Sequence, residues 1–150
     1  REMYEHILIA TDGSELAAKG VRHGLALAGP LGARVTVLSV SQPLQLLAAK
    51  EAIAAGVEDP VARYDQQIDE DMQERFRSIS QQASEHGIPI DLLHEIDESP
   101  AQAIVRTARL KGCDLIVMTS HGRQGTARLL LGSQTAEVLA HTTLPVLVVR

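Results

Sequence analysis

Apolar runs and segments of helical periodicity alternate along the whole chain, and this alternation is typical of a parallel sheet with crossover helices. Near-continuous apolar runs indicate strands that are buried on both faces, whereas the third run contains Asp91 and favours a sheet edge. The apolar runs predict five strands, at residues 6–11, 33–40, 89–94, 114–119 and 145–149.

The segments between these runs have the spacing of helices that bury one face. Because Gly costs about 1 kcal/mol in a helix relative to Ala, Gly20 and Gly24 in the first segment indicate that this helix lies very close to the sheet. In the second segment we expect one apolar face, formed by Val61, Ile68, Met72, Phe76, Ile79 and Ala83. Ser99 is expected to cap the third helix, which Pro100 opens. The four helices are predicted at residues 14–29, 60–86, 100–111 and 132–141.

These elements predict an α/β fold, an open five-stranded parallel sheet of Rossmann-like type with strand order 3-2-1-4-5 and helices on both faces. The 150 residues, 45% of them hydrophobic, fit a single domain that spans 1–150. Two stretches without regular periodicity, 41–59 and 122–131, are of a size that is often functional in compact domains.

Composition argues against several classes of function. A net charge of −5 and an aromatic content of 2% provide neither a basic face nor a base-stacking platform, so nucleic acid is not an expected partner. Cys113 is the only cysteine, which excludes an internal disulfide and fits a reducing compartment. No apolar run reaches the roughly 18 residues of a membrane-spanning helix, and no export signal is recognisable, so we expect a cytoplasmic protein without membrane attachment.

Candidate chemistry gathers where the first and fourth strands end, because ligands of open parallel sheets bind beyond the carboxyl ends of strands at the point where strand order reverses. The strongest local signal is Gly122, nine residues, and then Gly132 and Ser133 at a helix start. A phosphate needs unobstructed backbone N–H donors and the positive end of a helix, and this spacing offers both.

Each of these residues also has a structural interpretation. Gly122 can loosen a loop while Ser133 caps a helix, and spacing alone supports this alternative equally well. Asp12 can form the strand-to-helix turn instead of accepting hydrogen bonds from a ribose or an adenine amine. Arg123 and Arg128 can neutralise phosphate oxygens or remain solvated.

Several other nucleotide-binding and hydrolase motifs are missing from the sequence. There is no G-x-x-x-x-G-K-[ST] loop and no G-x-G-x-x-G after the first strand, which argues against a P-loop NTPase and a dinucleotide-binding Rossmann domain. There is also no G-x-S-x-G elbow for a nucleophilic serine. Of the six histidines, which lack metal-ligand spacing, only His121 falls at the expected crevice.

The segments HILIATDGSE, VTVLSV, DLIVMTSHGRQG and LLLGSQTAEVLAHTTLPVLVVR resemble the universal stress protein family along essentially the whole chain. The ATP-binding pattern of that family is Gly, two residues, Gly, nine residues, then Gly and Ser or Thr. Thr119 stands in the place of the first Gly, while Gly122, Gly132 and Ser133 match the rest. The branched side chain of Thr119 either crowds the ribose or replaces a contact through its hydroxyl.

The resemblance implies ATP as the ligand, with Mg²⁺ carried by the phosphates and not by a protein cage. It places Asp12 near the ribose and Ala10 and Val40 in the adenine pocket. The positions implied to bind ATP are Ala10, Asp12, Val40, Met118, Thr119, Gly122, Gly132, Ser133, Gln134 and Thr135, with Arg123 and Arg128 as further candidates. The resemblance also implies a homodimer paired through the last strand, Pro145, Val146, Leu147, Val148 and Val149.

The resulting prediction is an ATP-binding stress-response protein that uses nucleotide occupancy as a signal. At most slow hydrolysis or self-phosphorylation is expected, because no residue pair stands out as general base and metal clamp. A dimeric adaptor that binds no nucleotide is the alternative, and Thr119 is the feature that favours it. A hydrolase using Asp12 and His121 has the least support.

Overall fold

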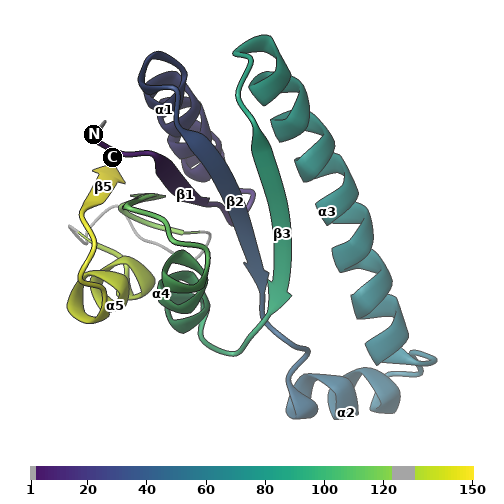
Figure 1. Cartoon of the computed structure of the whole chain (residues 1–150). Helices are drawn as coiled ribbons and strands as arrows, with labels where there is room; N and C mark the ends of the chain where they lie inside the picture. The colour runs from purple at the N-terminus through teal and green to yellow at the C-terminus, as the bar shows by residue number, and fades with distance from the viewer. Residues whose placement is uncertain (1–2, 123–130) are drawn as a thin grey trace.

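The computed structural model describes residues 3–122 and 131–150, and five parallel strands form one sheet in the order β3-β2-β1-β4-β5 (Figure 1). The predicted fold class and strand order are therefore confirmed, as is the edge position of the strand that contains Asp91. The strands are β1 His6–Ala10, β2 Arg34–Ser41, β3 Ile90–Ile96, β4 Leu115–Thr119 and β5 Val146–Val149.

Helices cover both faces of this sheet, with α1 and α3 on one face and α4 and α5 on the other (Figure 1). A further helix, α2, lies beyond the carboxyl ends of β2 and β3, within the stretch 41–59 that showed no clear periodicity. No helix among the described residues is long and apolar enough to cross a membrane. The helices are α1 Glu15–Leu31, α2 Leu46–Ala54, α3 Pro60–Glu85, α4 Pro100–Leu110 and α5 Ser133–His141.

The alternation of side chains along the central strands divides the core into two layers. Ile7 and Ile9 of β1 belong to the cluster under α1 and α3, while Leu8 between them belongs to the cluster under α4 and α5. All three side chains are fully buried. Burial of both faces explains why this strand reads as a continuous apolar run in the sequence.

The first helix approaches the sheet as closely as its glycines predict. A Cβ added at Gly24 would lie 2.4 Å from Cδ1 of Ile9, and one added at Gly20 would lie 2.8 Å from Cγ2 of Thr119. The helix continues past its expected end, through Pro30, and stops at Gly32, whose φ of 64° is in the left-handed region that glycine tolerates.

The long helix α3 corrects one expectation. Val61 was assigned to its buried face, but this side chain is 50% exposed, and the buried apolar positions are Met72, Ile79 and Ala83. A helix of 26 residues spans about 39 Å, whereas the seven residues of β3 span about 23 Å. The first turns of α3 therefore extend past the sheet and have no sheet surface to cover.

Candidate functional site

The strand order reverses between β1 and β4, and the segments that leave these two strands meet at the carboxyl edge of the sheet. A Cβ added at Gly122, after β4, would lie 2.8 Å from Oδ2 of Asp12, after β1. The two segments that the sequence placed on either side of a crevice are thus brought into contact, and a side chain at position 122 would displace the Asp12 carboxylate.

The turn after β1 is built from local hydrogen bonds. Oδ1 of Asp12 accepts a hydrogen bond from the backbone N–H of Ser14 at 3.0 Å, and Oγ of Ser14 accepts one from the N–H of Ala17 at 3.1 Å. Gly13 between them has a φ of 81°. Asp12 therefore has the turn-forming role that local sequence suggested, and its second carboxylate oxygen lies at Gly122.

The start of α5 has no side-chain cap. Gly132 occupies the N-cap position, its N–H donates to the carbonyl of Ser120 at 2.6 Å, and no side chain of the described residues accepts from the first turn. Ser133 is exposed as the first helical residue, so the interpretation of this serine as the cap is wrong. Among residues 3–122 and 131–150, no side-chain cap is recorded at the positive end of α5, so its first N–H groups remain able to bind an anion.

The next two residues anchor α5 through side-chain hydrogen bonds. Oγ1 of Thr135 donates to the carbonyl of Thr119 at 2.7 Å, and this side chain is only 2% exposed. Oε1 of Gln134 accepts a hydrogen bond from the N–H of Ala101, in the first turn of α4, at 2.9 Å. The starts of α4 and α5 are therefore held together beside the end of β4.

The two positions expected in the adenine pocket, Ala10 and Val40, lie on the same side of the sheet as Met118. Met118 belongs to the apolar cluster under α4 and α5, and Ala10 and Val40 pack against that cluster while staying partly exposed. They come from the ends of β4, β1 and β2, which are adjacent strands. The arrangement offers an apolar surface near the point where the carboxylate of Asp12 approaches Gly122.

Thr119 faces the opposite side of the sheet. Its methyl group lies where a Cβ on Gly20 of α1 would be, and its hydroxyl donates to the carbonyl of His121 at 2.8 Å. The side chain is 7% exposed. Both of its groups are therefore engaged in contacts within the fold.

His121 contributes an unpaired polar atom to the crevice. Its Nδ1 lies 3.1 Å from Oγ of Ser120, which is itself buried, while its Nε2 is buried without a hydrogen-bond partner among the described residues. Buried polar atoms in folded proteins nearly always have a partner, so this ring nitrogen is an exception among the described residues.

Arg75 of α3 is a residue of this region that sequence reasoning missed. Its Nη1 donates to Oγ of Ser39 at 2.6 Å, and that hydroxyl donates to the carbonyl of Thr11 at 2.7 Å. The guanidinium also covers Gly13, where any Cβ would collide with it. The only sequence signal was a serine inside the apolar second strand, because a buried hydroxyl requires a partner.

Other predicted residues lie elsewhere. Arg123 and Arg128 fall outside the described residues. Asp97, in the turn after β3, accepts hydrogen bonds from the N–H of Ser99 at 2.8 Å and from Arg106 at 3.2 Å, which lower the pKa of its carboxyl group. Cys113 is buried, and burial raises the pKa of its thiol to about 11, so this thiol is unreactive.

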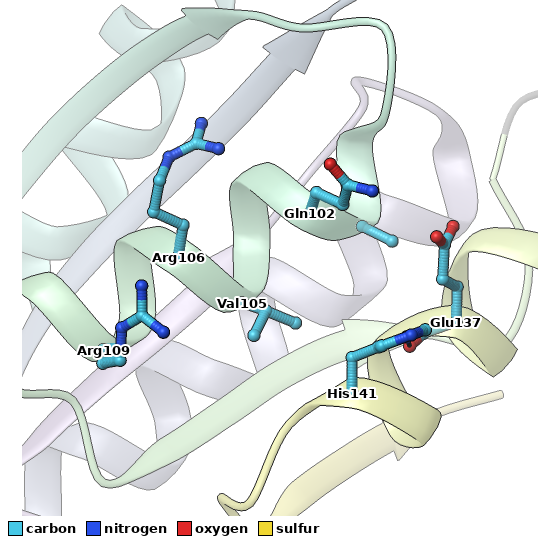
Figure 2. Close-up of a pocket in the computed structure, with 7 residues that line it drawn as sticks. Gln102, Val105, Arg106, Arg109, Glu137 and His141 are labelled. Atoms are coloured by element: carbon cyan, nitrogen blue, oxygen red, sulfur yellow. Dashed lines mark hydrogen bonds between the residues drawn. The ribbon is translucent and has the colours of Figure 1, made fainter.

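A separate groove of about 360 Å³ lies between α4 and α5 (Figure 2). It shares no residue with the predicted nucleotide site. Within residues 3–122 and 131–150, no group of three or more His, Cys, Asp and Glu side chains is placed to hold a metal ion. The groove is lined by Ala101, Gln102, Val105, Arg106, Arg109, Glu137 and His141.

Comparison with known proteins gives matches along nearly the whole chain. The model of the universal stress protein family matches residues 3–150. Universal stress protein MJ0531 of Methanocaldococcus jannaschii is 30% identical over 148 residues, which cover 99% of this chain and 83% of that protein. The solved structure of protein MJ0577 has a TM-score of 0.79 and 27% identity, covering 98% of this chain and 96% of that one.

Two further solved structures share the fold and were determined as nucleotide complexes. A universal stress protein in complex with cAMP has a TM-score of 0.71 at 22% identity, covering 99% of this chain and 98% of that one. The universal stress protein from Archaeoglobus fulgidus in complex with dAMP has a TM-score of 0.61 at 19% identity, with 99% of both chains covered.

Proposed function

Because the chain belongs to the universal stress protein family, we propose that its crevice between β1 and β4 binds an adenine nucleotide, ATP with Mg²⁺, and that occupancy of this site is the signal the protein provides. The observation that carries the proposal is the start of α5, where Gly132 leaves the positive end of the helix without a side-chain cap beside Gly122.

The phosphates are assigned to the start of α5. A Cβ at Gly132 would lie 3.3 Å from the carbonyl oxygen of Ser120 and 3.9 Å from the backbone nitrogen of Gly122, so the two glycines adjoin. This cradle without side chains lets phosphate oxygens approach backbone N–H groups, and the exposed hydroxyl of Ser133 adds a donor. Magnesium is proposed to arrive bound to the phosphates.

The base and the sugar are assigned to the neighbouring strand ends. Ala10, Val40 and Met118 give the adenine an apolar contact, and the Asp12 carboxylate accepts hydrogen bonds from the ribose hydroxyls. The solved complexes of related folds with cAMP and dAMP support an adenine nucleotide as the ligand class.

Thr119 is proposed not to obstruct this site. Its side chain packs against Gly20 on the α1 face, whereas the residues assigned to the adenine pack on the α4 and α5 face. We therefore expect Thr119→Gly to leave the affinity for ATP unchanged. A clear gain in affinity would show that the β-carbon crowds the ribose.

A regulatory role fits this site better than rapid turnover. Asp12 is engaged in the turn after β1, and within the described residues no group of three or more His, Cys, Asp and Glu side chains is placed to hold a metal ion. Hydrolysis or self-phosphorylation is therefore expected to be slow.

We further propose that the protein forms a homodimer through β5. This strand ends the sheet, and Leu147 is 39% exposed on it. An apolar edge strand favours pairing with another strand, and the same strand of a second copy provides a symmetric partner. Sedimentation of wild type and of Leu147→Lys tests this pairing, since a charge at the interface would favour the monomer.

The experiment that tests nucleotide binding is a calorimetric titration of nucleotide-stripped protein with ATP and Mg²⁺, with GTP as the comparison and a second temperature to detect binding of near-zero enthalpy. We expect saturable, ATP-selective binding near micromolar, about −8 kcal/mol. Silence at both temperatures would support the alternative, an adaptor that binds no nucleotide.

The decisive variant is Gly132→Asp. An aspartate is a favourable N-cap, which offsets the close approach of its Cβ to the carbonyl of Ser120 at 3.3 Å, and its carboxylate occupies and repels the phosphate position. ATP affinity should fall at least tenfold. The matched control is Ser99→Asp, which places the same side chain at the N-cap of α4 and should leave ATP affinity unchanged. An unchanged ATP affinity in Gly132→Asp would show that the phosphates do not bind at the start of α5.

A further inference from the structure

The short helix α2 has its large apolar side chains on the outside. Leu46, Leu47 and Ile53 are 70%, 68% and 61% exposed, whereas Ala49 is 9% exposed. At 100° per residue, Leu46, Leu47, Lys50 and Ile53 fall within one arc of the helix, with Ala49 just outside it, so this arc holds one cation beside its three apolar side chains. We call Leu46, Leu47 and Ile53 the α2 patch.

Folding of this chain alone does not explain the α2 patch. The helix packs on α3, and alanine is small enough to permit that contact, so the leucines play no part in it. Single exposed apolar residues are ordinary on protein surfaces, but three large ones gathered on one face of a nine-residue helix mark an interaction surface.

Charge is concentrated in the same part of the chain. Residues 41–75, which comprise α2 and the first turns of α3, contain eight Asp or Glu residues against three Lys or Arg residues. This excess of five acidic residues equals the net charge of −5 of the whole protein, so the remaining residues carry a net charge of zero. Glu51 lies one helical turn from Leu47, and Glu58 and Asp59 follow the helix.

The acidic surroundings decide between the possible occupants of the α2 patch. Anionic membranes and nucleic acids are repelled by this charge. A second copy would bring two acidic segments together, and a helix of about 14 Å is too short to provide the roughly 800 Å² per partner of a stable interface. A protein segment with apolar and basic side chains complements both the shape and the charge.

We propose that the α2 patch docks a cationic amphipathic helix of another protein, whose apolar side chains cover Leu46, Leu47 and Ile53 while its Lys and Arg residues face the carboxylates around them. The surface lies beyond the carboxyl ends of β2 and β3, so it is accessible from solvent (Figure 1). The proposal does not rest on nucleotide binding, because none of these residues belongs to the crevice.

The test uses a synthetic 14-residue helical peptide of leucine and lysine, with leucines on one face, titrated into the whole protein and followed by fluorescence anisotropy. A leucine and glutamate peptide of the same pattern, and a serine and lysine peptide, are the matched probes. Saturable binding of the leucine and lysine peptide alone is expected, with affinity that falls as salt is added.

Two sets of variants locate the binding. The triple change Leu46→Ser, Leu47→Ser and Ile53→Ser should weaken binding at least tenfold, and Glu51→Lys with Glu58→Lys should weaken it independently. Leu110→Ser removes a leucine that is 73% exposed on α4 and should change nothing. Circular dichroism shows whether each variant is folded. If the triple variant does not fold, the two glutamate substitutions still test the proposal.

Several outcomes would overturn the proposal. If the triple variant binds the leucine and lysine peptide with wild-type affinity, the peptide binds at another surface. If the leucine and glutamate peptide binds equally well, charge does not contribute to the affinity. Sedimentation to liposomes of phosphatidylglycerol that the triple variant loses would identify a membrane surface. Halving of the sedimented mass in the triple variant would identify a second copy as the occupant.

Discussion

Helices α1 and α2 both turn small residues toward the protein, yet their outer faces are opposite in character. In α1, Gly20 and Gly24 lie against the sheet, and charged residues such as Lys19 are exposed. In α2, Ala49 faces inward and Leu46 is exposed. Small residues therefore mark the inner face of both helices, whereas large apolar residues mark it only in α1, where Val21 and Leu25 are buried.

The difference follows from what each helix covers. α1 crosses the middle of the sheet and contacts β1 and β4, so its apolar side chains meet a broad apolar surface. α2 lies beyond the sheet, and the element it packs against is α3. The large hydrophobic side chains of α1 thus stabilise the fold, whereas we propose that those of α2 bind another protein.

The same substitution in the two helices gives the largest contrast. Leu25→Ala should reduce the free energy of unfolding by about 3 kcal/mol, because this side chain is fully buried and the change leaves a cavity. Leu47→Ala, at a 68% exposed position, should change it by less than about 0.5 kcal/mol. Urea denaturation measures both values, and a similar loss in the two variants would contradict the distinction.

The close contact of α1 gives the next largest effect. Gly24→Ala should destabilise the protein by about 1 to 2 kcal/mol, because crowding against Ile9 exceeds the helix-propensity gain of about 1 kcal/mol. Ile9→Val removes Cδ1, the atom nearest to the new methyl group. In a double-mutant cycle the two changes together should cost less than their sum, and simple additivity would argue against direct contact.

A smaller effect is expected where α3 is tied to the sheet. Arg75→Met keeps an unbranched side chain but removes the hydrogen bond to Ser39, and it should lower the free energy of unfolding by about 1 kcal/mol. Arg77→Met, at an exposed position two residues along the same helix, is the matched control and should have almost no effect. Equal losses would assign the effect to the helix surface in general.

The smallest effect comes from pH. Burial first, and then the charge of Arg34, lower the pKa of His6, which lies 2.7 Å through Nε2 from the hydroxyl of Thr36 in the sheet. The unfolded chain therefore binds a proton near pH 6.5 when the folded chain does not, so stability falls as pH drops from 7 toward 5. His6→Gln should flatten this decline, and an unchanged slope in unfolding measurements would assign it to other groups.

The sequence allowed the sheet to be predicted almost completely, because strands buried on both faces leave continuous apolar runs such as residues 114–119. The close approach of α1 was also predictable, since two glycines inside a helix need a packing reason. The meeting of Asp12 with Gly122 followed from strand order alone.

Side-chain directions and long-range contacts could not be predicted in the same way. The resemblance placed Thr119 where the family pattern has a glycine, but only the contact with Gly20 shows that its side chain faces α1. The bond from Arg75 to Ser39 joins residues 36 positions apart, and no local pattern indicates it. The exposure of Leu46 depends on where the sheet ends, and the periodicity of apolar residues in the sequence does not indicate that.

The buried thiol of Cys113 has a practical consequence for labelling. With a pKa of about 11, on the order of one thiol in a few thousand is ionised near pH 7.5. As the only cysteine of the chain, it leaves the native protein almost silent toward maleimide dyes. A cysteine introduced at Lys50, at the centre of the exposed face of α2, would therefore carry a fluorophore alone and report peptide docking without any change to the native thiol.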